Sequence, residues 1–174
     1  MKIIIMFIAL ILSGCAPTPK FMYAKEPRVP WPAEEYAIID NWTGANIVKG
    51  QAFLKTRGGD VKLGAGNKVY LSPVTSYSTQ FVDAIIYKSH GAGVVLVPES
   101  PDFRVMNYVK ISVADGDGRF TFHDVKNGDY YLYSTVTWET VGSQGTLNLQ
   151  GGWVIQKVTI SEDTRTNFIL NGIN

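Results

Sequence analysis

The side chains best suited to chemistry are two histidines and a short run of aspartates, and their spacing argues against catalysis. His90 and His123 lie in different segments, without a cysteine or carboxylate at the spacing of zinc ligands. The run Asp115-Gly116-Asp117-Gly118 offers the clustered oxygens that calcium prefers. However, Arg119 stands where a helical calcium loop needs another oxygen ligand, and Phe120 where it needs glycine. We therefore expect a hairpin turn there, and neither a catalytic residue nor a metal site nor a cofactor in the chain.

The single cysteine, Cys15, follows an apolar run that begins directly after Lys2. The run covers Ile3 to Leu12 and is far shorter than the roughly 20 residues that span a bilayer. A charged start, an apolar middle and small residues before a cut are typical of a removable export segment. We therefore expect residues 1–14 to be a signal peptide and the mature chain to begin at Cys15.

The residues Leu12-Ser13-Gly14-Cys15 resemble the lipobox of bacterial lipoproteins. In that family the bond before the cysteine is cut, the thiol receives a diacylglycerol, and the new amino group is usually acylated with a fatty acid such as palmitate. The resemblance implies a membrane anchor at Cys15, because about two acyl chains suffice for stable attachment. Alanine rather than aspartate follows at position 16, which in lipoproteins of diderm bacteria favours the outer membrane. The implied location is the cell envelope, at the outer membrane and facing the periplasm.

The charge balance argues against a nucleic-acid partner. Residues 1–14 contain one base and no acid, so the 160 residues that remain carry 15 bases and 15 acids. Phosphate binding needs a clustered basic face, whereas these charges are interspersed. The size fits one ordinary domain with a tail.

The first part of the mature chain, residues 15–35, is rich in proline and has no helical or strand period. Proline fixes the backbone and removes a hydrogen-bond donor, so we expect a semi-extended tether of about 3 Å per residue. Trp31 is a candidate for docking on the domain that follows. The globular domain is expected to cover residues 36–174.

Within that domain, short apolar runs alternate with glycine-rich turns, which predicts an antiparallel β-sandwich or barrel. One segment, Ser76 to His90, instead has apolar side chains at intervals of three to four residues and ends at Gly91-Ala92-Gly93. It predicts a short amphipathic helix across one end or face of the sheets, burying Phe81 and Ile85. The expected strands are Val48–Thr56, Lys68–Val74, Gly93–Pro98, Val105–Ala114, Arg119–Phe122, Tyr130–Thr140, Trp153–Ile160 and Thr166–Leu170.

Two turn motifs carry a resemblance to a known family. Asp115-Gly116-Asp117-Gly118-Arg119-Phe120-Thr121-Phe122 and Gly128-Asp129-Tyr130-Tyr131-Leu132 read as strand, turn and strand. They resemble the carboxypeptidase regulatory-like domain, one of the transthyretin-like or prealbumin-like sandwiches that also include the pilin-type CnaB domains. The resemblance covers residues 46–170 and implies a transthyretin-like sandwich of about seven or eight strands. The helix expected at about 76–90 is an insertion that departs from a minimal domain of this type. It also implies a binding, spacing or folding module, often placed among carbohydrate-binding-like folds.

Two activities known in this group of folds lack support in the sequence. A transthyretin-like hydrolase of 5-hydroxyisourate ends in Tyr-Arg-Gly-Ser, whereas this chain ends Leu170-Asn171-Gly172-Ile173-Asn174. Pilin-type relatives form a lysine-to-asparagine bond beside a buried acid. Lys49, Lys55 and Asn167 are candidates for it, but no partner carboxylate is identifiable.

The aromatic residues near the end of the domain are the remaining candidates for binding. Alternation along the strand from Tyr130 points Tyr131 and Tyr133 away from the face that holds Leu132 and Trp138. Outward tyrosines can stack on sugar rings or anchor a protein partner, although they can equally be ordinary strand residues. The candidate binding surface is Tyr131, Tyr133, Trp138 and Tyr87, which Trp153 would extend if the helix packs nearby.

We therefore expect a membrane-anchored lipoprotein that is not an enzyme and presents a binding or scaffold module to another component of the cell envelope, either a protein or a glycan. The alternative is a carbohydrate-binding module that uses the outward aromatics. A hydrolase, which would need a pocket gathering His90 or His123 with a carboxylate and a nucleophile, is a more distant alternative.

Overall fold

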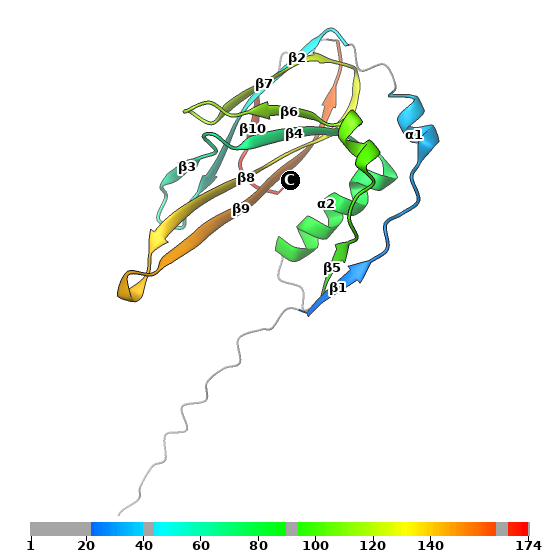
Figure 1. The fold of residues 1–174 in the computed structure, drawn as a ribbon. Coiled ribbons are helices and arrows are strands. Elements are labelled where there is room, and N and C mark those ends of the chain that lie inside the picture. The colour runs from blue at the N-terminus through cyan, green and yellow to red at the C-terminus, as the bar shows by residue number, and fades with distance from the viewer. Residues whose placement is uncertain (1–21, 40–43, 90–93, 163–166, 174) are drawn as a thin grey trace, which may run out of the picture.

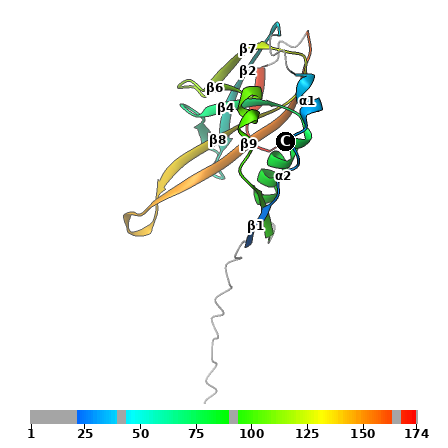
Figure 2. The same ribbon diagram turned by 45° about the vertical axis from the view of Figure 1, so that its right-hand side comes forward.

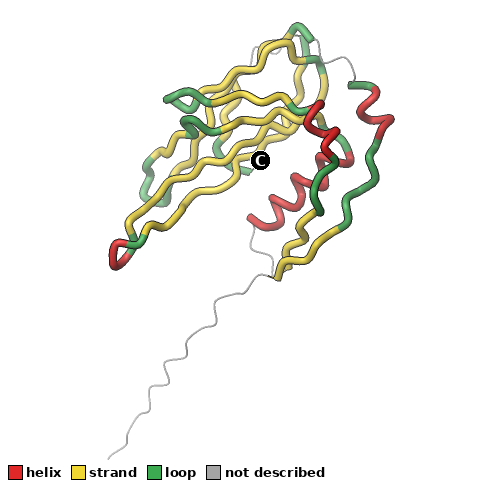
Figure 3. Tube along the Cα trace, in the orientation of Figure 1, coloured by secondary structure: helices red, strands yellow, loops and turns green. Residues whose placement is uncertain are grey.

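The computed structural model describes residues 22–39, 44–89, 94–162 and 167–173, and these form a β-sandwich with a helix on its outer face. Two sheets face each other, and the long helix α2 (Ser76–Ser89) lies beside one of them (Figure 1). Strands dominate, and α2 is the longest helix among the described residues (Figure 3). The expected all-β sandwich with one inserted helix is confirmed.

The first sheet is antiparallel throughout and is built around a long hairpin. Its strand order is β6-β4-β8-β9. The longest pairing joins β8 to β9 over fourteen residues of each strand. The strands are β4 (Lys68–Pro73), β6 (Lys110–Val113), β8 (Gly128–Val141) and β9 (Leu147–Ile160).

The second sheet is organised around β2 (Asn46–Lys55). This strand pairs antiparallel with β3 (Val61–Leu63) near one end and with β7 (Arg119–Val125) near the other. Its opposite edge pairs in parallel with β10 (Asn167–Leu170). Among the described residues the sandwich thus has eight strands, four in each sheet, which agrees with the seven or eight expected, and its β2–β10 pairing is parallel.

The core lies between the two sheets and follows the alternation of the strands. Along β8, Tyr130, Leu132 and Val136 are buried, while the odd-numbered residues between them are only half-buried. A side-chain period of two places these three on one face, as the sequence predicts. The core residues are Val48, Ala52, Val69, Leu71, Ala114, Phe120, Phe122, Val125, Tyr130, Leu132, Val136, Val154, Val158, Ile160 and Leu170.

A smaller cluster joins α2 to the outer face of the first sheet. Val82 and Ile85 are buried against Ile155 of β9, with Phe81 packed at the margin. The side chains of α2 therefore contact the sheet at intervals of three to four residues, as an amphipathic helix requires. The predicted burial of Ile85 is confirmed, and Phe81 is partly buried.

The N-terminal segment differs from the tether that the sequence predicts. β1 (Met22–Glu26) pairs in parallel with β5 (Val94–Pro98), and α1 (Ala33–Ala37) follows it. Tyr36 of α1 is only 1% exposed, and Trp31 stacks on it with ring centroids 4.3 Å apart. The docking of Trp31 is thus confirmed, but residues 22–35 belong to the folded domain. Only residues 16–21 lie between Cys15 and β1.

The expected strand over residues 105–114 is also only partly correct. Residues 103–108 form a short 3-10 helix, η1 (Phe103–Tyr108), and the strand begins at Lys110. The carboxylate of Asp102 accepts a hydrogen bond from the backbone N–H of Arg104 at 2.9 Å, which caps η1. The apolar residues of this segment line a cavity on the sheet instead of continuing the strand.

The far half of the β8–β9 hairpin extends beyond the sandwich (Figures 1 and 2). It carries three exposed apolar side chains, Val141 (76% exposed), Leu147 (65%) and Leu149 (70%). By alternation and register these share the sheet face on which α2 packs. None of the helices in the described part of the chain has the length and apolarity needed to cross a membrane.

Candidate binding site

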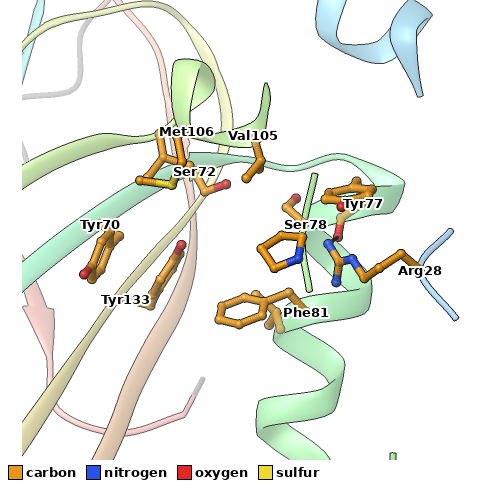
Figure 4. Close-up of a pocket in the computed structure, with 12 residues that line it drawn as sticks. Arg28, Tyr70, Ser72, Tyr77, Ser78, Phe81, Val105, Met106 and Tyr133 are labelled. Carbon is orange, nitrogen blue, oxygen red and sulfur yellow. Dashed lines mark hydrogen bonds between the residues drawn. The ribbon is translucent and has the colours of Figure 1, made fainter. Parts of the chain in front are cut away.

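A cavity of about 170 Å³ lies where α2, η1 and the segment after β1 meet the outer face of the first sheet (Figure 4). Concave, mostly apolar cavities with a few polar groups are the usual form of small-molecule sites. Its lining is Arg28, Tyr70, Ser72, Tyr77, Ser78, Phe81, Val82, Pro101, Val105, Met106, Val109 and Tyr133.

Two tyrosines form the sheet side of this cavity. Tyr70 of β4 and Tyr133 of β8 are directly opposed in the strand register. Their rings stack with centroids 5.1 Å apart and an interplanar angle of 14°. The pair exists because alternation sends both side chains to the outer face, while Leu71 and Leu132 go to the core. Ser72, two residues after Tyr70, adds a hydroxyl to the same wall.

The helix side of the cavity comes from one face of α2. Tyr77 and Phe81 are four residues apart and therefore lie one turn apart on the same face. The Phe81 ring lies 5.8 Å from that of Tyr133 and is perpendicular to that of Trp153 at 6.2 Å. The Tyr77 hydroxyl accepts a hydrogen bond from the backbone N–H of Asp102 at 2.6 Å, which joins the helix to the start of η1.

Hydrogen bonds at its N-terminus hold α2 in place. The hydroxyl of Ser78 donates to the carbonyl of Pro73 at 2.7 Å, and the Ser78 N–H donates to the hydroxyl of Thr75 at 3.1 Å. The carboxylate of Glu35, from α1, accepts from both the N–H and the hydroxyl of Ser76 at 2.7 Å each. These bonds satisfy donors that a helix start leaves free. The N-terminal segment is therefore part of the structure that positions the cavity.

Arg28 provides the positive charge of the cavity. Its guanidinium carbon lies 3.8 Å from the centroid of the Tyr77 ring, and Nη2 donates to the Tyr77 carbonyl at 3.2 Å. The nearby Arg104 is different, because its guanidinium is paired with Asp102 at 2.6 Å. This pairing holds the pKa of the Asp102 carboxyl at about 2, chiefly through the side-chain hydrogen bond from Arg104.

Burial raises the pKa of the tyrosine at the sheet wall. Loss of solvent, and secondarily the proximity of Tyr70, raises the pKa of Tyr133 to about 12. Its hydroxyl, like that of an ordinary tyrosine, is protonated at neutral pH and can donate a hydrogen bond.

The predicted binding surface is only partly assembled by the fold. Tyr133 lines the cavity, and its neighbour Tyr131 lies under α2, where its hydroxyl is hydrogen-bonded to that of Thr79 at 3.1 Å. Both point away from the core as predicted, but they are half-buried by the helix and do not form an exposed platform. Trp138 lies on the opposite face of β8 from the two tyrosines and so does not belong to this surface. Tyr87 lies in α2, but its side chain is outside the described residues.

The remaining candidates from the sequence do not gather into a reactive site. Cys15 and His90 lie outside the described residues, and His123 is exposed on β7. Lys49 and Asn167 are register partners on β2 and β10, yet both are exposed, whereas a lysine-to-asparagine bond requires a buried acid beside it. Lys55 lies at the other end of β2.

The aspartate-rich run is a hairpin turn, as predicted. The carboxylate of Asp115 accepts hydrogen bonds from the backbone N–H groups of Asp117 and Arg119, and Asp117 pairs with the Arg119 guanidinium at 2.7 Å. Gly118 has a φ of +75°, which glycine adopts without steric cost. In the described part of the chain, no cluster of three or more histidine, cysteine, aspartate or glutamate side chains could hold a metal ion.

Sequence reasoning missed Arg28, Tyr70 and Met106 as cavity residues. Alternation in Val69-Tyr70-Leu71 does place Tyr70 on the outer face, so this residue was within reach of the pattern. Arg28 and Met106 come from segments read as tether and strand, and no local signal places them at α2.

No protein-family model matches this chain, and no curated protein does. The chain is, however, similar to a solved crystal structure of a protein from Pseudomonas aeruginosa, which is named as a candidate carbohydrate binding protein. The two share 29% sequence identity with a TM-score of 0.69, over 83% of this chain and 99% of the other. The fold is thus shared along almost the entire length of that protein.

Proposed function

We propose that this protein is a non-catalytic binding protein of the cell envelope, anchored through a lipid on Cys15, and that its cavity takes a glycan. The observation that carries the glycan assignment is the aromatic cavity over the Tyr70–Tyr133 pair. The similarity to a protein named for carbohydrate binding supports the same ligand class.

The chemistry of the cavity suits a sugar ring. Aromatic side chains offer flat apolar faces, and tyrosine adds a polar hydroxyl at one end. Tyr70, Tyr77, Phe81 and Tyr133 surround the space, and the hydroxyl of Ser72 faces it (Figure 4). A sugar ring has C–H groups on its faces and hydroxyls at its edge. Its faces would therefore contact the aromatic side chains, and its hydroxyls would hydrogen-bond to the hydroxyls of the cavity.

The test is a binding titration of the purified protein against a panel of oligosaccharides by calorimetry. Tyr70→Ala and Met106→Ala each remove lining from the cavity and should weaken glycan binding. Tyr70→Ala should cost about two- to ten-fold, because it removes an aromatic contact worth about 0.5–1.5 kcal/mol. Met106→Ala should weaken binding because it removes apolar contact area. Phe103→Ala is the matched control on η1, because Phe103 is 82% exposed and does not line the cavity. Equal losses in the control and cavity variants, or no binding to any glycan of the panel, would count against the proposal.

A second candidate function is docking of an envelope protein, and one observation favours it. The extended hairpin exposes Val141, Leu147 and Leu149 on a single face. Exposed apolar patches of this kind are typical of protein interaction sites. Replacing all three with serine should abolish capture of such a protein and leave glycan binding unchanged.

A further inference from the structure

The positive charge of Arg28 bears on which class of glycan the cavity takes, and this inference rests on the proposed glycan function of the cavity. Arg28 lines the cavity, with its guanidinium directed along the Tyr77 ring toward Ser78 (Figure 4). We infer that the ligand carries a carboxylate, as in a uronic acid residue of an acidic glycan, and that this carboxylate pairs with Arg28.

The first argument is the missing counter-ion. Among the described residues, no carboxylate lies within ion-pair distance of Arg28, whereas Arg104 is neutralised by Asp102. Arg28 is half-buried, and removing a charge from water costs free energy unless the charge is paired. The aromatic face of Tyr77 and the Tyr77 carbonyl compensate only in part. A ligand carboxylate would supply the partner that the described residues do not.

The second argument is the number of free donors. A guanidinium has five N–H groups in a planar fork that matches the two oxygens of a carboxylate. Nη2 donates a hydrogen bond to the Tyr77 carbonyl, and the Nε atom is buried without a partner among the described residues. The Arg28 guanidinium, which already lies at the cavity, therefore has N–H groups left to donate to a ligand.

The third argument is that the backbone on both sides of Arg28 is clamped. The side chain of Gln80, on α2, accepts a hydrogen bond from the N–H of Val29 at 3.1 Å and donates one to the carbonyl of Pro27 at 2.9 Å. The two residues that flank Arg28 are therefore fixed to the helix by a single side chain. Gln80 is a positioning residue, since it does not line the cavity but holds the residue that does.

The experiment compares oligomers that differ only in the carboxylate, such as oligogalacturonate against galactose oligomers of the same length, by calorimetry at low and high salt. The wild-type protein should bind the acidic oligomer at least about ten-fold more tightly, because charge-assisted pairs are worth that much. Added salt should reduce the preference if the pair is open to solvent. Arg28→Gln should weaken binding of the acidic oligomer about ten-fold more than binding of the neutral one, so that the preference is lost. Arg28→Lys should retain part of the preference.

A second variant guards against a simple folding defect. Gln80→Ala leaves the guanidinium in the chain but releases its backbone, so it should reduce the acidic preference by a smaller factor than Arg28→Gln. Equal wild-type affinity for both oligomers, or a preference that survives in Arg28→Gln, would overturn the inference while the glycan function stands. If the wild-type and variant proteins are folded but bind neither oligomer, the inference is overturned and the proposed function is weakened with it.

Discussion

The position that a β-carbon of Gly151 would occupy is taken by the carbonyl oxygen of Val136 on the neighbouring strand. Gly151 is opposite Thr137 in the β8–β9 register and has a φ of +100°. This close approach occurs where β8 passes from the buried Val136 to the exposed Thr137, so it marks the point at which the hairpin leaves the sandwich. Only glycine fits there without displacing the partner strand.

We therefore expect Gly151→Ala to lower the free energy of unfolding by about 2 kcal/mol or more, because it combines a strained φ with a backbone clash. Urea denaturation followed by tryptophan fluorescence measures the change. The matched control is Gly152→Ala, since a β-carbon at position 152 would meet nothing within 4 Å. A Gly151→Ala protein as stable as the Gly152→Ala protein would contradict the argument.

The buried tyrosines should give the protein a late phase of ionisation in alkali. Desolvation raises the pKa of both Tyr130 and Tyr133 to about 12. Because the folded protein holds these protons more tightly than the unfolded chain does, stability is fully present below pH 10 and falls as the pH rises from about 10 to about 12. Absorbance at the tyrosinate band should show a group of the nine tyrosines titrating near pH 12. Tyr133→Phe should shrink that group, and an unchanged titration curve would refute the assignment.

The link between α1 and α2 should be measurable through Glu35. Its carboxylate receives two hydrogen bonds from Ser76, at the start of α2. Glu35→Ala should cost about 1 kcal/mol of stability, typical for loss of a helix cap. It should also speed amide exchange in the first turn of α2, as read by hydrogen–deuterium exchange. Glu34→Ala removes an exposed acid from the same helix and should leave that exchange unchanged.

Lipid attachment should depend on a single atom, the sulfur of Cys15. We expect Cys15→Ser to abolish incorporation of labelled fatty acid and processing at that site, because serine lacks the thiol that receives the lipid. The thermal unfolding of the domain should be unchanged, since β1 begins seven residues later. A variant that is still lipidated and processed, or one that no longer folds, would contradict a lipid anchor at Cys15 that lies outside the folded domain.

The sandwich itself was predictable from local signals. Alternation in Tyr130 to Val136 fixes which side chains enter the core, and the glycines of the Asp115–Gly118 turn fix where the chain reverses. The spacing of Tyr77, Phe81 and Ile85 marks the helix. Each of these patterns lies within about ten residues and needs no distant partner.

The cavity was only partly predictable, because it depends on contacts between distant segments. β1 is a five-residue strand that forms only because β5, about seventy residues later, offers a parallel edge. Proline-rich composition around residues 27–32 reads as linker, yet there Arg28 meets Tyr77 across 49 positions of sequence. The tyrosines Tyr131 and Tyr133 were placed on the correct face, but no local signal says that α2 covers them.

The parallel pairing of β1 with β5 also determines how the protein would carry a mechanical load. In a lipidated chain, tension from the bilayer enters at the start of β1 and runs along the strand, so it shears all five residue pairs of the β1–β5 ladder at once. Two residues beyond the end of β1, the same strand of chain reaches Arg28. A glycan in the cavity would therefore be joined to the membrane anchor through this short connection at Arg28, as well as through the sheet that carries Tyr70 and Tyr133.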